Sequence, residues 1–323
     1  MRSLQDGSVL AADIAYKPKL TPLWSLAARA LGAHDPDPSV RNPDWLAEPF
    51  LGAVERELLD GNPVMAALDR DYRDASIDAR TAVAYMLQRT RFVDEHLQRA
   101  VMANATQVVI LGAGFDSRAY RFRNLLRRLR VFEVDDGPTQ EYKRRRVQDV
   151  LGGPPPNVTY VPVDFSEQTL GRSLASCGYR ADCVTCFIWE GVTMYLSEDT
   201  VRSTFRTLAS SCVPGSRIIF DYWTTRHIED GPRQHEWIRR RFEMAATWGE
   251  PVQFGIAEGT APTWLSHVGL DLIEELPFHG QEAYRRYLTR KRVIRQRDRW
   301  WPEPSRAEHP GTWLAAALVP QSR

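Results

Sequence analysis

Short apolar runs alternate with segments whose apolar residues recur at helical spacing along most of this sequence. The runs lie at residues 107–111, 130–135, 158–163, 182–189 and 217–223, and two more follow at 270–276 and 313–319. A run that is apolar on both faces is typical of a strand buried in a parallel sheet. The alternation therefore predicts an α/β fold: a doubly wound, mainly parallel, seven-stranded Rossmann-like sheet.

A long helix is predicted just before the first strand, over residues 81–103. Met86, Val93 and Leu97 form one apolar stripe there, and Arg89 falls on or beside that stripe. A guanidinium at such a position has two interpretations. It is a snorkelling or salt-bridged arginine, or it is a planar two-pronged donor that binds a carboxylate.

The first strand breaks into Gly112-Ala113-Gly114. Glycines allow a sharp turn and leave no side chain between backbone and ligand. Residues 116–129 have apolar residues at helical spacing, so a helix N-terminus is expected to face the same place. A strand, a glycine turn and a helix are typical of nucleotide-type cofactor sites, although a tight turn without a ligand uses the same residues.

The second strand ends on Asp135, where such folds place a carboxylate on ribose hydroxyls, about 20 residues past the glycines. The ligand is therefore expected to be a nucleoside. A dinucleotide fingerprint requires Gly or Ala where this chain has Ser117, and the preceding Asp116 would repel a pyrophosphate. The local chemistry favours S-adenosylmethionine (SAM) over NAD.

Four segments in order resemble the successive motifs of the leucine carboxyl methyltransferase family. They are Arg89-Thr90-Arg91-Phe92-Val93-Asp94, Leu111-Gly112-Ala113-Gly114-Phe115-Asp116-Ser117-Arg118, Phe132-Glu133-Val134-Asp135 and Trp189-Glu190-Gly191-Val192-Thr193-Met194-Tyr195-Leu196. The similarity runs from about residue 80 to 225 and is weaker on either side. It implies a methyltransferase sheet and SAM as the cofactor.

The resemblance also implies roles for single residues. Arg89 would hold the methionine carboxylate of SAM, Gly112 with Ala113 and Gly114 would give close backbone approach, and Asp135 would bind the ribose. Asp164 with Phe165 would line the adenine, and Glu190 would face the cofactor near the transferring methyl. Tyr195, together with Glu190, is a candidate for the chemical step or the acceptor pocket, and Arg29 is a loosely aligned N-terminal contact.

The 323 residues suffice for one large core with additions. Residues 1–80 are rich in Pro, Asp and Ala, with helical pieces near 23–31 and 44–59, and are expected to form a helical lid on the same domain. Residues 81–323 would form the SAM-binding core. Two interruptions of the strand–helix alternation, 224–257 and 281–310, are expected to be insertions on the acceptor side.

Charge is balanced, with 42 basic and 41 acidic residues, so no global field recruits nucleic acid or a membrane. The basic tract from Arg285 to Arg299 is either a solvated helix or a site for an anionic acceptor or RNA. No segment has the length of a membrane helix and no signal peptide is evident, so a cytoplasmic location is the default. Cys183 and Cys186 are predicted to be strand residues, and no metal site is expected. Oligomeric state is not predicted.

Together these features predict a SAM-dependent O-methyltransferase that acts on a carboxylate of a small molecule, such as a secondary metabolite. A carboxylate is already ionised at pH 7 and needs no general base. A phenol or alcohol acceptor would need one, and His227 or His235 would be the candidates. An NAD-dependent oxidoreductase, a non-catalytic SAM-binding protein and an RNA-modifying enzyme are the rival interpretations.

Overall fold

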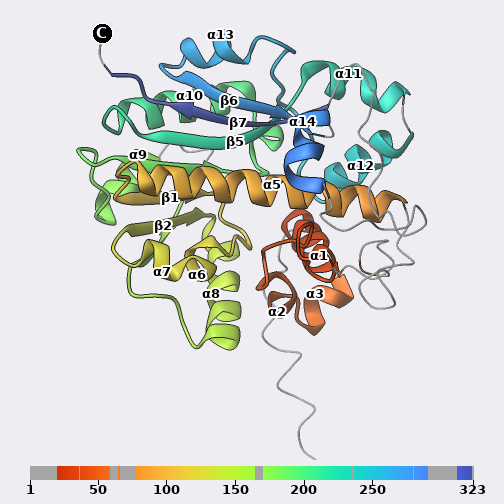
Figure 1. Ribbon diagram of the computed structural model, residues 1–323, viewed down its shortest axis with the longest axis horizontal. Coiled ribbons are helices and arrows are strands. Elements are labelled where there is room, and N and C mark those ends of the chain that lie inside the picture. Colours follow the sequence, from red (N-terminus) through yellow and green to blue (C-terminus); the bar gives the residue numbers. More distant parts are fainter. Residues whose placement is uncertain are drawn as a thin grey trace, which may run out of the picture.

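A seven-stranded sheet with helices on both faces forms the body of the protein (Figure 1). The computed structural model describes residues 20–35, 37–58, 65, 77–163, 170–234, 236–278, 280–289 and 311–321. The strand order is β3-β2-β1-β4-β5-β7-β6. The strands are β1 (Gln107–Leu111), β2 (Arg130–Asp135), β3 (Val158–Pro162), β4 (Thr185–Trp189), β5 (Arg217–Trp223), β6 (Asp271–Pro277) and β7 (Thr312–Leu318).

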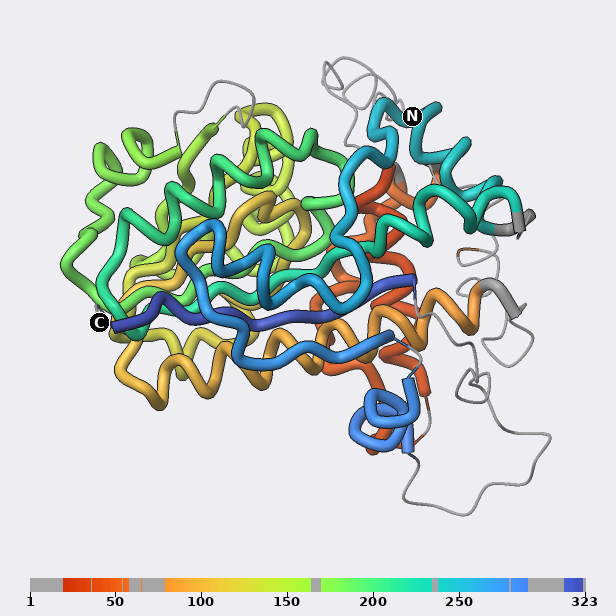
Figure 2. Tube along the Cα trace, turned by 90° about the horizontal axis from the view of Figure 1, so that it is seen from above, coloured from red at the N-terminus to blue at the C-terminus, as the bar shows by residue number. Residues whose placement is uncertain are grey.

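The first five strands are parallel, and β7 is antiparallel to both of its neighbours, β5 and β6. The predicted fold class, a mainly parallel, doubly wound sheet of seven strands, is confirmed. The last of the described strands, β7, lies inside the sheet and not at its edge (Figures 1 and 2).

Alternate residues of β1 belong to different cores. Val108 and Ile110 pack in the cluster that includes the helices before the sheet, whereas Val109 and Leu111 pack in the cluster on the other face. All five residues of β1 are buried, as expected for a strand covered on both faces.

The longest helix, α5 (Ile77–Met102), packs against β4, β5 and β7 and also against α1 (Leu20–Ala33), which lies below it in Figure 1. The other helical segments described are α2 (Ala47–Phe50), α3 (Ala53–Leu58), α6 (Arg118–Arg121), α7 (Arg123–Leu126), α8 (Gly137–Leu151), α9 (Leu170–Ser176), η3 (Thr193–Tyr195), α10 (Glu198–Ser210), α11 (Thr225–Gln234), α12 (Glu236–Thr247), α13 (Ala261–Ser266), α14 (Gln281–Ala283) and η4 (Tyr284–Leu288). None of the helices among these residues is long and apolar enough to cross a membrane.

Two predicted helices are wrong in extent. The single helix expected over residues 116–129 is two short helices, α6 and α7, separated at Phe122. The side chain of Asp116 accepts a hydrogen bond from the backbone N–H of Arg118 at 2.7 Å, which fixes a turn before α6 begins. Likewise, the piece expected at 44–59 is split into α2 and α3 around Gly52.

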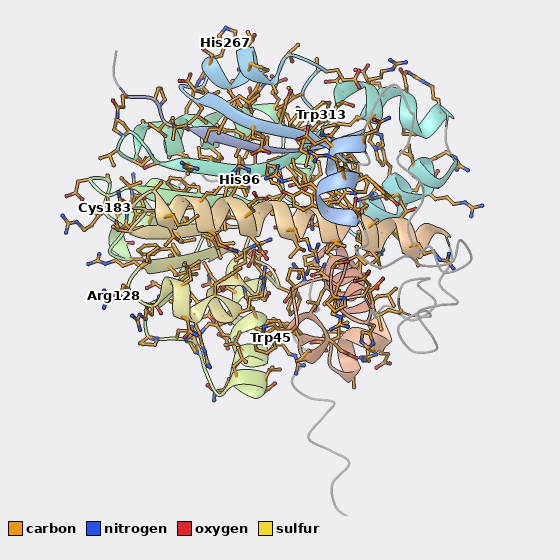
Figure 3. All side chains as sticks on the ribbon, in the orientation of Figure 1. Trp45, His96, Arg128, Cys183, His267 and Trp313 are labelled. Carbon is orange, nitrogen blue, oxygen red and sulfur yellow. The ribbon has the colours of Figure 1, made fainter. Side chains whose placement is uncertain are left out.

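The predicted strand at 182–189 begins later than expected, because β4 starts at Thr185. Cys186 is buried within β4, but Cys183 precedes the strand. Cys183 therefore lies at the amino end of the sheet (Figure 3), away from the carboxyl ends of the strands, where folds of this kind bind their ligands.

Candidate functional site

A cleft of about 580 Å³ opens at the carboxyl ends of β1, β2 and β4. Its floor is the turn after β1, where Gly112 has φ +61° and Gly114 has φ +36°. Both values lie in the left-handed region that favours glycine. A Cβ on Gly112 would lie 2.4 Å from Cγ2 of Val192, so this turn has no room for a side chain.

We expect Gly112→Ala to lower the free energy of unfolding by about 2 kcal/mol, because it combines left-handed strain with overpacking. Urea denaturation measures the change. In Gly112→Ala/Val192→Ala the steric part should be recovered and the backbone strain should remain. Equal losses in the single and the double variant would show that the contact with Val192 is not the cause.

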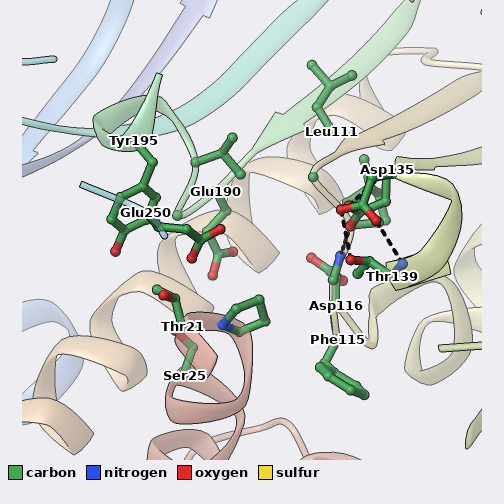
Figure 4. Close-up of a pocket in the computed structure, with 18 of the residues that line it drawn as sticks. Thr21, Ser25, Leu111, Phe115, Asp116, Asp135, Thr139, Glu190, Tyr195 and Glu250 are labelled. Atoms are coloured by element: carbon green, nitrogen blue, oxygen red, sulfur yellow. Dashed lines mark hydrogen bonds between the residues drawn. The ribbon is translucent and has the colours of Figure 1, made fainter. Parts of the chain in front are cut away.

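Asp135, the last residue of β2, lies at one end of the cleft (Figure 4). Its Oδ2 accepts a hydrogen bond from the backbone N–H of Gly114 at 2.6 Å, and its Oδ1 accepts one from Asp136 at 2.8 Å. Burial raises the pKa of Asp135 to about 6. The carboxylate is thus fixed in direction, while each oxygen keeps a further lone pair for a ligand donor.

The other end of the cleft holds a chain of buried ion pairs. Nε of Arg89 lies 2.8 Å from Oε1 of Glu190, and Nη1 of Arg118 lies 2.8 Å from Oε2 of the same carboxylate. Nη1 of Arg89 also lies 3.2 Å from Oδ2 of Asp221. Arg118 in turn pairs with Asp94 and Asp116. Glu190 is therefore a carboxylate shared between two guanidinium groups.

This arrangement decides the ionisation of Glu190. Burial alone would raise its pKa, but Arg118 and Arg89 outweigh burial, and the pKa of Glu190 lies below its ordinary value. Glu190 is anionic at neutral pH and is a poor proton acceptor.

Helix α1 lies over the cleft and contributes Thr21, Pro22, Ser25 and Arg29 to its lining (Figure 4). Nη2 of Arg29 donates to the backbone carbonyl of Phe115 at 2.9 Å, and Nε lies 3.2 Å from Oδ2 of Asp44. Arg29 thus links the N-terminal segment to the loop that follows the glycine turn.

Tyr195 stands at the Glu190 side of the cleft, on η3, which follows β4 closely (Figure 4). Burial raises the pKa of Tyr195 to about 12, so the phenol keeps its proton at neutral pH. The neighbouring segment is held in place by Gln253, whose backbone N–H donates to the carbonyl of Met194 at 2.8 Å and whose Nε2 donates to that of Tyr195 at 3.0 Å.

The structure brings most of the predicted site residues together along this cleft. They are Arg89, Gly112, Ala113, Gly114, Asp135, Glu190 and Tyr195, with Arg29 beside them. Asp164, Phe165 and His235 lie outside the described residues, as does the basic tract from residue 290 onward.

His227, which the sequence suggested as a base, lines neither this cleft nor the smaller cavity beside it. Its ring packs edge-on against Trp223 at 5.2 Å and Phe242 at 6.0 Å between ring centroids. The backbone of Gly311 also lies close to the ring, since a Cβ atom added at Gly311 would be 2.1 Å from Nδ1 of His227. The geometry does not favour His227 as a base for a ligand in either cavity.

Sequence reasoning missed Asp221, which organises the Glu190 side of the cleft. Its Oδ2 accepts from the hydroxyl of Tyr85 at 2.9 Å, and its Oδ1 accepts from the backbone N–H of Gly191 at 2.6 Å. The signal was present, because an acidic residue in the apolar run of β5 is unusual unless it is paired. Its partners lie far away in the sequence, so they could not be named.

Comparisons with known proteins show the family and the fold of this chain. A family model described as leucine carboxyl methyltransferase matches residues 23–209, more than half of the chain. A protein named "Putative S-adenosyl-L-methionine-dependent methyltransferase" from Mycolicibacterium gilvum is 30% identical over 215 residues, 65% of this chain and 67% of that protein. Another of the same name from Mycobacterium avium is 30% identical over 257 residues, 77% of this chain and 78% of that protein.

A solved structure described as a "putative methyltransferase from Thermobifida fusca YX" aligns with 95% of this chain and 96% of its own chain, with a TM-score of 0.54 and 11% identity. At that identity the likeness is one of fold.

Proposed function

Because the chain belongs to the leucine carboxyl methyltransferase family and is a SAM-dependent methyltransferase, we propose that it methylates a carboxylate oxygen of a small molecule. The family assignment removes the NAD-dependent alternative. The acceptor and the roles of single residues are part of the proposal.

The cleft has the features that SAM requires. The glycine turn exposes backbone, Asp135 offers oriented lone pairs for ribose hydroxyls, and Arg89 provides a cation for the methionine carboxylate. The closest contacts of Arg89 with Glu190 and Asp221 use Nε and Nη1, while Nη2 lies 3.3 Å from the sulfur of Met86. When bound, SAM supplies a methyl group on a sulfonium centre.

One observation carries the preference for a carboxylate acceptor: the two candidate catalytic side chains are both unsuited to take up a proton. Glu190 is held ionised by Arg89 and Arg118, and Tyr195 keeps its proton at neutral pH. An acceptor that is itself anionic needs no base, so the residues have only to align it and exclude water. Glu190 and the arginines then keep the cleft preorganised, and Tyr195 donates a hydrogen bond.

The lid and the acceptor-side insertions belong to this proposal. Helix α1, within residues 1–80, covers the cleft, and Gly249, Glu250, Pro251 and Gln253 of the 224–257 insertion line it. The described part of the 281–310 insertion, residues 281–289, lines neither the cleft nor the cavity beside it. There, Arg286 pairs with Glu95 and Glu274, as expected for a structural arginine.

The experiment that tests the function uses methyl-labelled SAM, the pure protein and an extract of the source organism. Labelled products are fractionated and treated with mild alkali. Release of the label as methanol identifies a methyl ester and supports the proposal. A product stable to alkali would overturn it in favour of a phenol or alcohol acceptor, and Glu250, a carboxylate on the Tyr195 side of the cleft, would be the first base to test.

We expect the affinity for S-adenosylhomocysteine (SAH) to fall about tenfold between pH 8 and pH 5. The pKa of Asp135 in the free protein is about 6, and a ribose hydroxyl donates to the ionised carboxylate, so protons compete with the ligand below that pH. Calorimetry across this range measures the profile. Asp135→Asn serves as the control and should bind weakly with a flat profile; a parallel fall in that variant would place the titrating group elsewhere.

A further inference from the structure

A second, smaller cavity adjoins the cleft next to Tyr195. Thr21, Ser25, Arg89, Gly191 and Tyr195 line both spaces, so the same side chains border the cleft and the cavity. The smaller cavity has about 30 Å³, which is room for about two water molecules or one carboxylate group. It is too small for a whole acceptor, whose remainder would extend into the larger cleft.

Aromatic side chains from four parts of the chain form the walls of this cavity. Trp24 comes from α1, Tyr85 from α5, Trp223 from β5, and Trp248 from the segment after α12. Apolar walls of this kind exclude water and strengthen any charge interaction inside them.

Besides Arg89, which pairs with Glu190 and Asp221, the positive charge at this cavity is Arg241 of α12. Its guanidinium carbon lies 4.9 Å from the ring centre of Trp223, 5.2 Å from that of Trp24 and 5.8 Å from that of Tyr85. In the described part of the chain no carboxylate lies within ion-pair distance of Arg241, although Arg239 two residues earlier pairs with Glu243 at 2.8 Å. A half-buried guanidinium that packs on three aromatic rings and has no ion-pair partner among the described residues is suited to receive an anion from outside the chain.

The hydroxyl of Tyr195 is a second donor at the same place. Within the residues described, it makes no hydrogen bond, and the ring borders both the cleft and the cavity. A protonated phenol beside a guanidinium can donate one hydrogen bond to a carboxylate that the guanidinium also binds.

We propose that this cavity is the recognition site for the acceptor's carboxylate, with Arg241 and Tyr195 as its donors and Arg241 as the residue that selects for negative charge. This inference rests on the proposed function. A lone pair of the carboxylate oxygen forms the new O–CH₃ bond, the C–S bond breaks, and its electron pair stays on sulfur, which becomes a neutral thioether. The ester product has no charge for Arg241 to bind. Methylation therefore weakens the binding of the product in the cavity.

The test uses four proteins: wild type, Arg241→Gln, Arg241→Lys and Arg239→Met. The last is the matched control, because it removes an exposed positive charge from the same helix. Each protein is incubated with methyl-labelled SAM and limiting extract, and the alkali-labile label is counted. SAH affinity and melting temperature are measured in parallel.

We expect Arg241→Gln to lose at least tenfold in labelled ester, Arg241→Lys to retain part of the activity, and Arg239→Met to match wild type. All four should bind SAH equally. With the acceptor purified from the labelled fraction, wild type loaded with SAH should bind the acid at least tenfold more tightly than its methyl ester, and Arg241→Gln should lose this difference.

Undiminished ester formation by Arg241→Gln would overturn the assignment and leave the carboxyl methyltransferase function intact. Equal losses of SAH affinity and ester formation would also overturn it, because Arg241 would then have only a structural role. An alkali-stable product from wild type would overturn the proposed function and this inference together.

Discussion

Replacement of Glu190 by alanine is expected to lower the free energy of unfolding by about 3 to 5 kcal/mol. The carboxylate is buried and lies between the guanidinium groups of Arg89 and Arg118, at 2.8 Å from each. Removing it leaves two buried cations to share the carboxylates that remain, those of Asp221, Asp94 and Asp116. Urea denaturation of the ligand-free protein measures the loss.

Two further variants separate charge from shape. Glu190→Gln keeps the size and one acceptor oxygen, so a smaller loss is expected than for alanine. Glu198→Ala removes a carboxylate that pairs with Arg202 at 2.6 Å on the surface, and it should cost no more than about 1 kcal/mol. A loss for Glu190→Ala as small as that for Glu198→Ala would contradict this prediction. The ion pairs of Glu190 with Arg89 of α5 and Arg118 of α6 would then add little to stability.

Removing Arg89 or Asp135 is expected to weaken SAH binding by about 1 to 3 kcal/mol in each case, roughly 5- to 150-fold. The two alanine variants should differ in stability. Arg89→Ala leaves Glu190 and Asp221 without their shared cation and should cost about 3 to 5 kcal/mol of unfolding free energy.

Asp135→Ala should leave the ligand-free protein within about 1 kcal/mol of wild type at pH 8. Because burial raises the pKa of Asp135, its protonated form is favoured in the fold, and the stability it contributes at low pH is lost as the pH rises through about 6. Calorimetry with SAH and urea denaturation give the two quantities. Unchanged SAH affinity in both variants would contradict the assignment of the cofactor site.

Most of the strands could be predicted from the sequence because they are largely apolar and buried on both faces, as in β1, β2 and β5. The predicted 130–135 coincides with β2, and 217–223 coincides with β5. The glycine turn and Asp135 could also be placed, since the turn directly follows β1 and Asp135 is the last residue of β2. Local sequence determines these features, and the sheet order then brings them to one edge.

The contacts that could not be predicted from the sequence join residues that lie far apart in the chain. Arg118 was visible as part of a motif, but its ion pairs with Asp94 and Glu190 join three elements. Arg241 was visible only as one of three consecutive arginines on a helix. Its packing against Trp24, Tyr85 and Trp223 requires α1, α5 and β5 to be in place.

The position of β7 has a consequence for how this protein is made. Although β7 is the last of the described strands in sequence order, it pairs with both β5 and β6, so β6 has no hydrogen-bonded neighbour in the sheet until residues 312–318 have been synthesised. Until then β5, which is buried on both faces in the finished fold, is an exposed edge and a template for pairing with other chains. Nascent chains stalled before residue 312 should therefore be the species that chaperones hold and that aggregates at high expression.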